Sequence, residues 1–392
     1  MNERQGRLLL RGELVPGVVR FAAGRITAVE TIDRRPGPDS RTIVAPGLID
    51  LHVHGYGGGE PLETLDRMCR ALAANGTTAF LATLFPAEPA LLGRQAEALW
   101  HAVRSRGEGA GARILGSHLE GPFVNPRSAG ALPREELAEP SLAALRAILG
   151  PSSGDGRGIR AMTLAPELPG AGELAQELVR SGVRVSLGHS LATAEEARRA
   201  ARAGATGATH LFNAMRPLHH REAGLAGFAL SSDALIAEII GDLVHVGPEA
   251  FALALRARGT HGLALVSDAL AGAGTGCEVF HSHGRRCTVR DGAIWFDDPT
   301  DPSGRRLTGA AATQLEATRR LVRAGVLSLE EALTMGSESP AAALGLASEV
   351  GRLAVGARAD LIVLRGTDLE LSEVLVGGEP VALAPAPGGE RR

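Results

Sequence analysis

The sequence predicts an α/β fold in which a TIM-like (β/α)8 barrel is joined to a small β-sandwich domain built from both chain ends. Three observations predict it. Eight short apolar runs alternate with helix-length segments through the middle of the 392-residue chain. Both ends show the period-two alternation of antiparallel strands. Nearly every middle run ends in a side chain that can bind a metal or move a proton. We expect the β domain at residues 1–45 with 350–385, and the barrel at residues 46–349.

The β domain is predicted from short strands at the two ends of the chain. Apolar runs at residues 8–10 and 26–29 are separated by glycines, and the same pattern returns at residues 359–364 and 374–376. Neither end is long enough to bury a core by itself. We therefore expect the two ends to fold together.

The barrel strands are predicted from the apolar runs of the middle segment. The runs lie at residues 43–53, 78–84, 114–119, 159–164, 183–187, 205–210, 235–240 and 263–266. Segments with a helical pattern, such as residues 171–180 and 192–203, separate them. A doubly wound open sheet is the alternative architecture. The polar residues favour the barrel, because a barrel brings the carboxyl ends of all its strands to one face.

The composition excludes several kinds of chemistry. The chain contains no lysine, so Schiff-base enzymes, P-loop nucleotide hydrolases and metal centres bridged by a carboxylated lysine are excluded. A net charge of −3 provides no basic surface for nucleic acid, and a small-molecule substrate is expected. No apolar run is long enough for a signal peptide or a membrane span. With three cysteines that we interpret as free thiols, a cytoplasmic location is expected.

Candidate metal ligands follow the predicted strands. His52 and His54 are two residues apart on an extended strand, so both imidazoles lie on the same side. Glu120, His189 and His210 follow the third, fifth and sixth runs. This mixture of imidazole and carboxylate suits a divalent metal, with Zn²⁺ expected first and Fe²⁺ as the alternative. The residues allow one or two ions for each chain.

Asp268 is the candidate catalytic residue at the end of the eighth run. From that position its carboxylate can take a proton from an attacking water and return it to a leaving group. An N-cap of a following helix is the alternative role for this aspartate. In a two-metal site of a lysine-free chain, Glu120 is the candidate bridging ligand.

The order of motifs along the chain resembles the amidohydrolase superfamily and, within it, the N-acetylglucosamine-6-phosphate deacetylase family. The motifs are PGLIDLHVHG, HLEGPF, GHS, THLFNAM, DLVHV, SDA and GRLAVGARADLIVL. Many amidohydrolases share the first and the last, whereas HLEGPF together with GHS and THLFNAM is specific to the deacetylase branch. The resemblance covers almost the whole chain.

The resemblance implies metal-dependent removal of acetate from N-acetylglucosamine 6-phosphate. It assigns the principal metal to Glu120, His189 and His210. The two histidines of the first strand would help to hold a second metal in members that use two, and Asp268 would be the general base and acid.

The resemblance also implies how the sugar phosphate is bound. The phosphate would contact Arg221 and His245, with backbone groups of Asn213 and Ala214 assisting. A guanidinium and an imidazolium beside backbone donors make a suitable phosphate site. Family members can complete this site with residues of a neighbouring subunit, so a homodimer is implied.

One position departs from the family pattern. The family usually places a histidine near the acyl carbonyl of the substrate, whereas this chain has Leu132 there. Leucine offers no hydrogen bond. Three explanations stay open. His219 or His220 substitutes for the histidine; the substrate differs, for example N-acetylgalactosamine 6-phosphate or another N-acyl compound; or the protein binds sugar phosphates with weak or no turnover.

A Cys/His cluster lies in the last third of the barrel segment. Cys277, His281, His283 and Cys287 superficially resemble a zinc site. They lie in a glycine-rich insertion with an Asp-Gly turn, which is typical of a hairpin. We therefore expect a flap over the active site.

Overall fold

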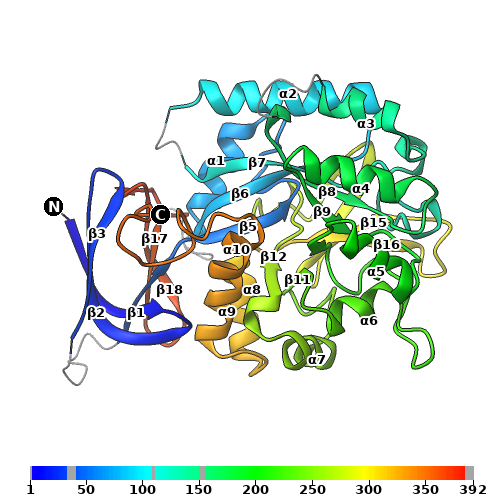
Figure 1. Ribbon diagram of the computed structural model, residues 1–392. Coiled ribbons are helices and arrows are strands. Elements are labelled where there is room, and N and C mark those ends of the chain that lie inside the picture. The colour runs from blue at the N-terminus through cyan, green and yellow to red at the C-terminus, as the bar shows by residue number, and fades with distance from the viewer. Residues whose placement is uncertain (1, 33–40, 108–110, 151–155, 385–392) are drawn as a thin grey trace.

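Eight parallel strands form a barrel at the centre of the molecule (Figure 1). This computed structural model describes residues 2–32, 41–107, 111–150 and 156–384. The strands follow one another around the sheet in chain order, without the reversal that a doubly wound sheet requires. The TIM-like barrel is therefore confirmed. Its strands are β5 (Leu48–Val53), β6 (Thr77–Leu84), β7 (Arg113–Leu119), β8 (Ile159–Leu164), β9 (Arg184–Leu187), β10 (Gly207–Ala208), β11 (Ile236–Ile240) and β12 (Leu263–Val266).

Helices cover the outside of the barrel (Figure 1). Several begin at a capping box, in which a side-chain hydroxyl and a glutamate three residues later bond each other's backbone N–H groups; Thr193 with Glu196 is one example. None of the described helices combines the length and the apolar character that a bilayer crossing needs. The helices are α1 (Leu65–Ala73), α2 (Pro89–Ser105), α3 (Leu142–Leu149), α4 (Ala171–Arg180), α5 (Ala194–Arg202), α6 (Gly224–Ser231), α7 (Pro248–Arg258), α8 (Gln314–Arg323), α9 (Leu329–Gly336) and α10 (Glu338–Ala343).

The chain ends meet in one seven-stranded sheet beside the barrel. One face of this sheet buries Leu8, Phe21 and Leu361 in a core of its own, while Leu9 and Ile362 on the other face pack against α8 and α9. The β domain built from both ends is thus confirmed, and its exact boundaries stay a prediction. The strands, in sheet order, are β19 (Glu379–Pro380), β18 (Glu370–Val376), β17 (Leu361–Arg365), β4 (Thr42–Pro46), β1 (Asn2–Leu10), β2 (Glu13–Ala22) and β3 (Arg25–Thr31).

The first predicted barrel strand, residues 43–53, is wrong as a single element. Its first half is β4 in the sheet of the chain ends, and its second half is β5 in the barrel. The break falls at Gly47, where a Cβ atom would lie 2.0 Å from Oγ1 of Thr78. The chain passes between the two domains at the one residue type small enough for this contact.

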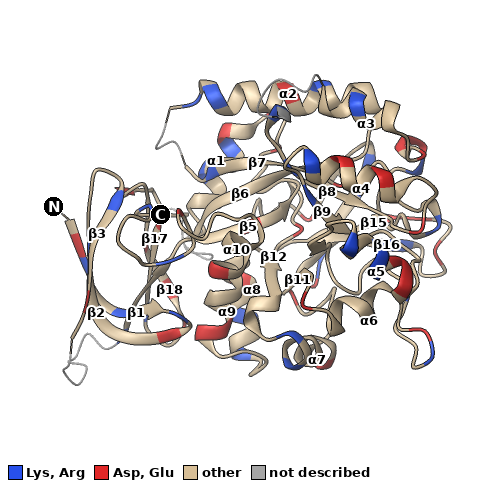
Figure 2. Cartoon of the chain, in the orientation of Figure 1, with Lys and Arg blue, Asp and Glu red and all other residues tan. Residues whose placement is uncertain are grey.

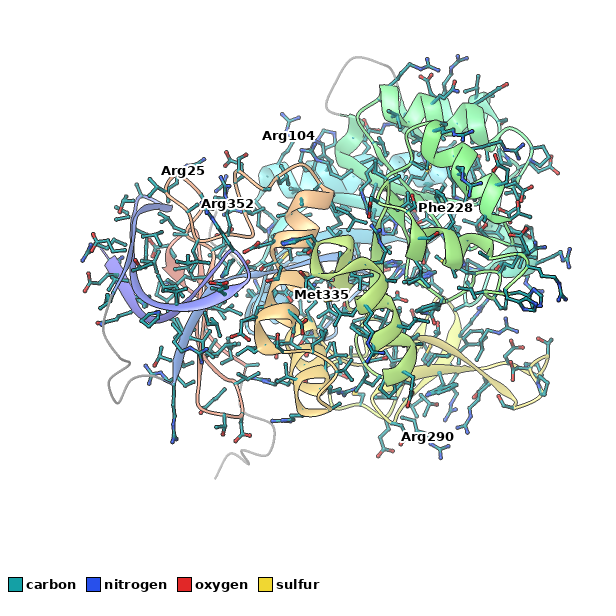
Figure 3. The ribbon with its side chains drawn as sticks, turned by 60° about the horizontal axis from the view of Figure 1, so that its bottom comes forward. Arg25, Arg104, Phe228, Arg290, Met335 and Arg352 are labelled. Carbon is teal, nitrogen blue, oxygen red and sulfur yellow. The ribbon has the colours of Figure 1, made fainter. Side chains whose placement is uncertain are left out.

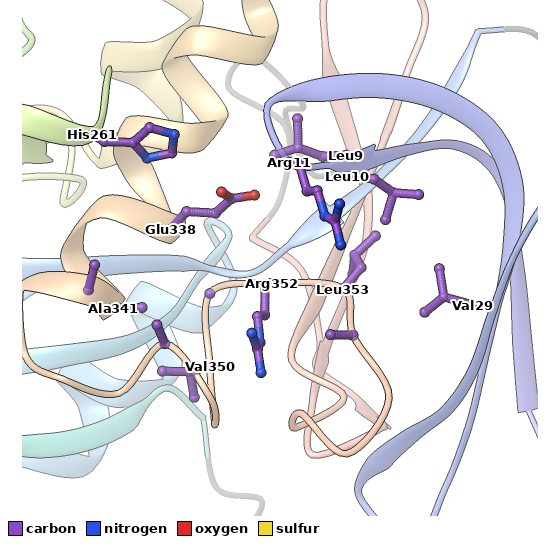
Figure 4. Close-up of a pocket in the computed structure, with 14 residues that line it drawn as sticks. Leu9, Leu10, Arg11, Val29, His261, Glu338, Ala341, Val350, Arg352 and Leu353 are labelled. Atoms are coloured by element: carbon purple, nitrogen blue, oxygen red, sulfur yellow. The ribbon is translucent and has the colours of Figure 1, made fainter. Parts of the chain in front are cut away.

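A cavity of about 610 Å³ lies between the β domain and the barrel (Figure 4). Arg11 comes from the loop after β1, and Glu338 and Arg352 come from the barrel side and the segment after α10. His261 lines it just before β12 begins, so the cavity lies at the amino-terminal end of the barrel strands. Barrel enzymes place their chemistry at the opposite end.

Charged side chains are interspersed over the outer helices and the sheet of the chain ends (Figure 2). Neither sign collects over one element in this view. This agrees with the small net charge of −3.

Side chains help to close the seam between the first and last barrel strands. Gln314, the fully buried first residue of α8, donates from Nε2 to the carbonyl oxygens of Ile49 (2.7 Å) and Leu265 (2.6 Å). Oδ1 of Asp50 accepts from the backbone N–H of Ser267 at 3.2 Å. The amide of Gln314 therefore bridges β5 and β12 at one level of the seam, and backbone bonds join the two segments beyond it, from Asp268 to His52 and from His54 to Ala269.

Replacing Gln314 with leucine is expected to destabilise the fold. The change leaves two buried carbonyl oxygens without their donor, which costs about 2–4 kcal/mol in the free energy of unfolding. Urea unfolding followed by circular dichroism measures it. Gln176→Leu on the exposed face of α4 is the matched control, and its effect should stay within about 0.5 kcal/mol. Equal effects of the two substitutions would contradict the proposed role of Gln314.

Candidate metal centre and active site

His52 and His54 project together from the carboxyl end of β5. Their Nε2 atoms lie 3.3 Å apart, and both side chains are buried. The spacing of two along an extended strand therefore puts both imidazoles on one side, as predicted.

Glu120, directly after β7, is the centre of the cluster. Its Oε1 lies 3.0 Å from Nε2 of His189 and 3.1 Å from Nε2 of His210. The same oxygen is 3.3 Å from Nε2 of His52, and Oε2 is 3.1 Å from Nε2 of His54. Two groups that can hold a metal ion result, one with His52 and His54 and one with His189 and His210, and they share Glu120.

The electrostatics of the cluster favour a cation at its centre. Burial alone would raise the pKa of Glu120, but contacts with His52, His189 and His210 outweigh it and hold that pKa well below its ordinary value. The carboxylate is 3% exposed and carries its charge in the interior. An anion surrounded by imidazole nitrogens is the environment that a divalent metal satisfies.

The hydrogen bond of His189 tests whether the cluster fits a metal. Its Nδ1 lies 3.1 Å from the carbonyl oxygen of Ser128, so Nδ1 carries the hydrogen and donates it. Nε2 then keeps its lone pair and faces Glu120. This is the tautomer that a metal ligand needs.

Strained backbone accompanies these ligands. Left-handed φ angles are rare for residues with a side chain and cost about 1 kcal/mol or more each. Six of the twelve such residues in the described part of the chain lie at the carboxyl ends of the last four barrel strands, where packing must impose these angles. The residues are His189 (46°), His210 (30°), Phe212 (77°), Ala214 (48°), Leu243 (62°) and Asp268 (52°).

Asp268 joins the cluster after β12. Its backbone N–H donates to the carbonyl oxygen of His52 at 2.8 Å, and its Oδ1 lies 3.4 Å from Nε2 of the same histidine. The next element in the chain is the strand β13 (Val279–Ser282). The alternative of a helix N-cap is therefore wrong, because no helix follows this aspartate.

A cavity of about 120 Å³ lies over the cluster, and a second of about 400 Å³ shares His54 and Phe85 with it. Ligand groups and apolar side chains line the smaller cavity together. Its lining consists of His54, Phe85, Glu120, Gly130, Ala131, Leu132, His189, His210, Asn213, Ala214, His245, Asp268, Leu307 and Thr308.

Three of the four expected phosphate-binding residues line this cavity: Asn213, Ala214 and His245. Nδ1 of His245 lies 2.7 Å from Oδ2 of Asp242, so this carboxylate orients the ring. Arg221 is not in the lining. It lies in the exposed loop between β10 and α6, with its guanidinium 2.9 Å from Nε2 of His220.

Leu132 lies in the cavity wall, at the position where the resemblance leads us to expect a histidine. It is 3% exposed and packs with Val124 and Ala129. Neither of the suggested substitutes, His219 and His220, lines the cavity. Thr308, which no sequence motif indicated, also lines the cavity.

The Cys/His insertion forms a four-stranded antiparallel sheet beside the cavity. Its strands are β13, β14 (Arg285–Arg290), β15 (Ala293–Asp297) and β16 (Arg305–Ala310). The predicted Asp-Gly turn joins β14 to β15, and Arg290, the last residue of β14, lies at the bottom of the molecule in Figure 3. None of the four Cys and His residues belongs to either described metal group.

Two arginines fasten this sheet to the loop that carries Leu132. Arg285 donates to the carbonyl oxygen of Ala131 at 2.9 Å, and Arg306 donates to that of Gly130 at 3.3 Å. Residues from β16 also line the cavity. The flap expected from the sequence therefore forms part of the cavity wall.

Two further charged or titratable residues beneath the cluster were missed from the sequence. His118 of β7 is buried with its ring 4.7 Å from that of His52, and burial lowers the pKa of His118 to about 3. Glu238 of β11 lies 3.6 Å from Nδ1 of His52. Glu238 could have been noticed in the sequence, because it is a charged residue inside the apolar run 235–240.

Comparison with known proteins agrees with this geometry. The model of the amidohydrolase family matches residues 43–381. The chain belongs to the amidohydrolase family.

This amidohydrolase is similar to several named deacetylases. It is 35% identical to the N-acetylglucosamine-6-phosphate deacetylase of Bacillus subtilis, over 89% of this chain and 88% of that protein. It is 32% identical to the N-acetylgalactosamine-6-phosphate deacetylase of Escherichia coli O157:H7, over 96% of this chain and 98% of that protein. A solved structure of the Mycobacterium smegmatis N-acetyl-D-glucosamine-6-phosphate deacetylase, in complex with that sugar phosphate, superposes with a TM-score of 0.84. It is 33% identical and covers 97% of this chain and 98% of that chain.

Glu120→Gln is expected to weaken metal binding by both groups, because the oxygen atoms of Glu120 face both. The loss should exceed the about 10–100-fold that changes beyond the ligands cost. Metal analysis after dialysis against limiting Zn²⁺ measures it. Glu167→Gln is the control. The carboxylate of Glu167 accepts hydrogen bonds from Asn125 and Ser190. Retention of metal by Glu120→Gln would remove Glu120 from the ligand set.

Proposed function

We propose that this amidohydrolase removes the acetyl group from N-acetylglucosamine 6-phosphate and releases glucosamine 6-phosphate and acetate. The position of Asp268 carries the proposal, because its carboxylate lies beside a buried cluster of four histidines and one glutamate. The named relatives are deacetylases of amino-sugar phosphates, and most of those described above act on the glucosamine compound.

The ligand roles follow from the two groups. Glu120, His189 and His210 would hold the principal ion, and His52 and His54 would hold a second ion with Glu120 as the bridge. Mixed imidazole and carboxylate ligands suit Zn²⁺ first and Fe²⁺ second. A divalent metal held by these residues would polarise an amide carbonyl and make a water more acidic.

Asp268 would move the proton of the reaction. Its carboxylate accepts a proton as the oxygen of water attacks the amide carbon, and it returns that proton to the nitrogen as the C–N bond breaks. The products are acetate and the free amine. The bond from its N–H to the carbonyl of His52 keeps the carboxylate next to the ligands throughout.

The cavity wall would select the acyl group. Phe85, Leu132 and Leu307 are apolar and line the same cavity as Asp268. This wall suits the methyl of an acetyl group and excludes water from the cleaved bond. The hydroxyl of Thr308 is the polar group that the lining offers in addition to the ligands, Asn213 and His245.

The phosphate would be bound at the other side of the cavity, by His245 and by backbone groups of Asn213 and Ala214. Arg221 would complete the site from its exposed loop. The homodimer and the cytoplasmic location stay predictions for this chain.

Asp268→Asn is expected to lower the rate of acetate release by about 10²–10⁴-fold, because an amide cannot accept the proton. Acetate release from N-acetylglucosamine 6-phosphate by the metal-loaded protein measures it, with metal content determined in parallel. N-acetylgalactosamine 6-phosphate and unphosphorylated N-acetylglucosamine are assayed in parallel. Asp301→Asn, in the loop between β15 and β16, is the control and should leave the rate unchanged. Wild-type turnover by Asp268→Asn would refute the assignment.

Arg221→Ala is expected to raise KM for the phosphorylated sugar by about 10–100-fold, because a hydrogen bond to a charged group contributes about 1.5–3 kcal/mol. The kcat should change little, and the unphosphorylated sugar should be unaffected. Steady-state kinetics with both sugars separate these effects. Arg202→Ala, at the end of α5, serves as the control. If the substitution raises KM equally for the phosphorylated and the unphosphorylated sugar, Arg221 does not bind the phosphate.

A further inference from the structure

A charged pair is buried inside the barrel beneath the metal cluster. Nη1 of Arg184, on β9, lies 2.8 Å from Oε1 of Glu238, on β11, and the residues are 9% and 1% exposed. Barrel interiors are ordinarily filled with branched apolar side chains. A buried ion pair costs about as much desolvation energy as its attraction returns. This pair therefore calls for a reason other than stability.

The strand between the two partners makes room for them. Gly207 of β10 lies between β9 and β11, and a Cβ atom there would approach Nη2 of Arg184 to 2.6 Å. The same nitrogen donates to the carbonyl oxygen of Ile236 at 3.0 Å. The guanidinium is thus held in one orientation, with Glu238 in front of it.

The second oxygen of Glu238 faces a candidate metal ligand. Its Oε2 lies 3.6 Å from Nδ1 of His52, whose Nε2 faces Glu120 and Asp268 at 3.3 and 3.4 Å. Both Nδ1 and Oε2 are buried, and neither has a hydrogen-bond partner in the part of the chain that the structure describes. The two atoms lie just beyond hydrogen-bond distance of each other.

His118 also touches His52 but offers it no hydrogen bond. The two rings meet edge to face at 4.7 Å and 89°. Nε2 of His118 is bonded to the hydroxyl of Thr163 at 2.8 Å, and that hydroxyl continues to Thr209. Glu238 is therefore the acceptor that the surroundings provide for Nδ1 of His52.

We propose that Glu238, held by Arg184, is the positioning residue of the second metal group and accepts the Nδ1 hydrogen of His52. The lone pair of Nε2 then points at the place shared with His54 and Glu120, and the carboxylate makes this imidazole a stronger ligand. The inference rests on the proposal that these three residues hold an ion.

The two metal groups thus receive different support. His189 is oriented by a neutral backbone carbonyl, that of Ser128, whereas His52 is oriented by a charged carboxylate. A change at Glu238 acts on the group of His52 and His54 and leaves the group of His189 and His210 intact.

Glutamine cannot replace Glu238 in this role. Arg184 and His52 are both hydrogen donors, so they need one acceptor oxygen each. An amide offers one oxygen, and its NH₂ group then faces a donor. Glu238→Gln therefore removes the charge and one acceptor oxygen of this side chain and keeps its size.

Titration of the metal-free full-length protein with Zn²⁺ alone, against a chromophoric chelator, tests the proposal without substrate. The wild type should bind two ions. Glu238→Gln should bind the first ion with unchanged affinity and the second about 10–100-fold more weakly. Arg184→Met should weaken the same ion by a smaller factor. Asp360→Asn is the matched control, because Asp360 is also a buried carboxylate and lies in the β domain, away from the cluster. It should bind both ions as the wild type does.

Thermal unfolding of the metal-free variants confirms that each is folded before titration. Wild-type affinity for both ions in Glu238→Gln would overturn the proposal, as would equal weakening of both ions. A wild type that binds a single ion, unaffected by Glu238→Gln, would also overturn it. The deacetylase proposal is tested separately, because acetate release and the effect of Asp268→Asn are measured whatever the number of ions.

Discussion

The buried charge of Glu120 is the constraint on which the rest of the site depends. A carboxylate that is 3% exposed needs partners, and it finds them in imidazoles carried by β5 and by the segments after β9 and β10. Only a barrel brings these carboxyl ends to one point. The left-handed backbone at His189, His210 and Asp268 shows that packing forces these side chains inward against local preference.

Closure of the barrel and the chemistry of the site share the same seam. Gln314 and Asp50 join β5 to β12 from below, and the N–H of Asp268 bonds the carbonyl of His52 above them. The carboxylate that we propose as the proton carrier is thereby tied to the strand that leads to two of the candidate ligands. Stability of the seam and geometry of the proposed proton transfer depend on one another, although Gln314 touches no ligand.

The wall of the cavity is assembled from parts far apart in the chain. Leu132 comes from the loop after β7, and Thr308 comes from β16 in the flap. Arg285 and Arg306 fasten the flap to the loop through backbone carbonyls, a contact that is independent of the side chain at position 132. Leucine in place of the histidine that the resemblance leads us to expect therefore makes this part of the wall apolar, and the two arginine bonds do not depend on it.

The sequence by itself determined the barrel, the β domain of both ends and the residues of the candidate metal cluster. These follow from local rules: apolar runs set the strands, a spacing of two sets His52 beside His54, and polar residues at strand ends converge in any parallel barrel. Only the tertiary structure decided the break at Gly47, the bridge of Gln314, the pair of Arg184 with Glu238, and the place of Arg221 outside the cavity lining. Each of these depends on packing or contacts between side chains distant in sequence, and neither apolar periodicity nor motif spacing records which distant groups touch.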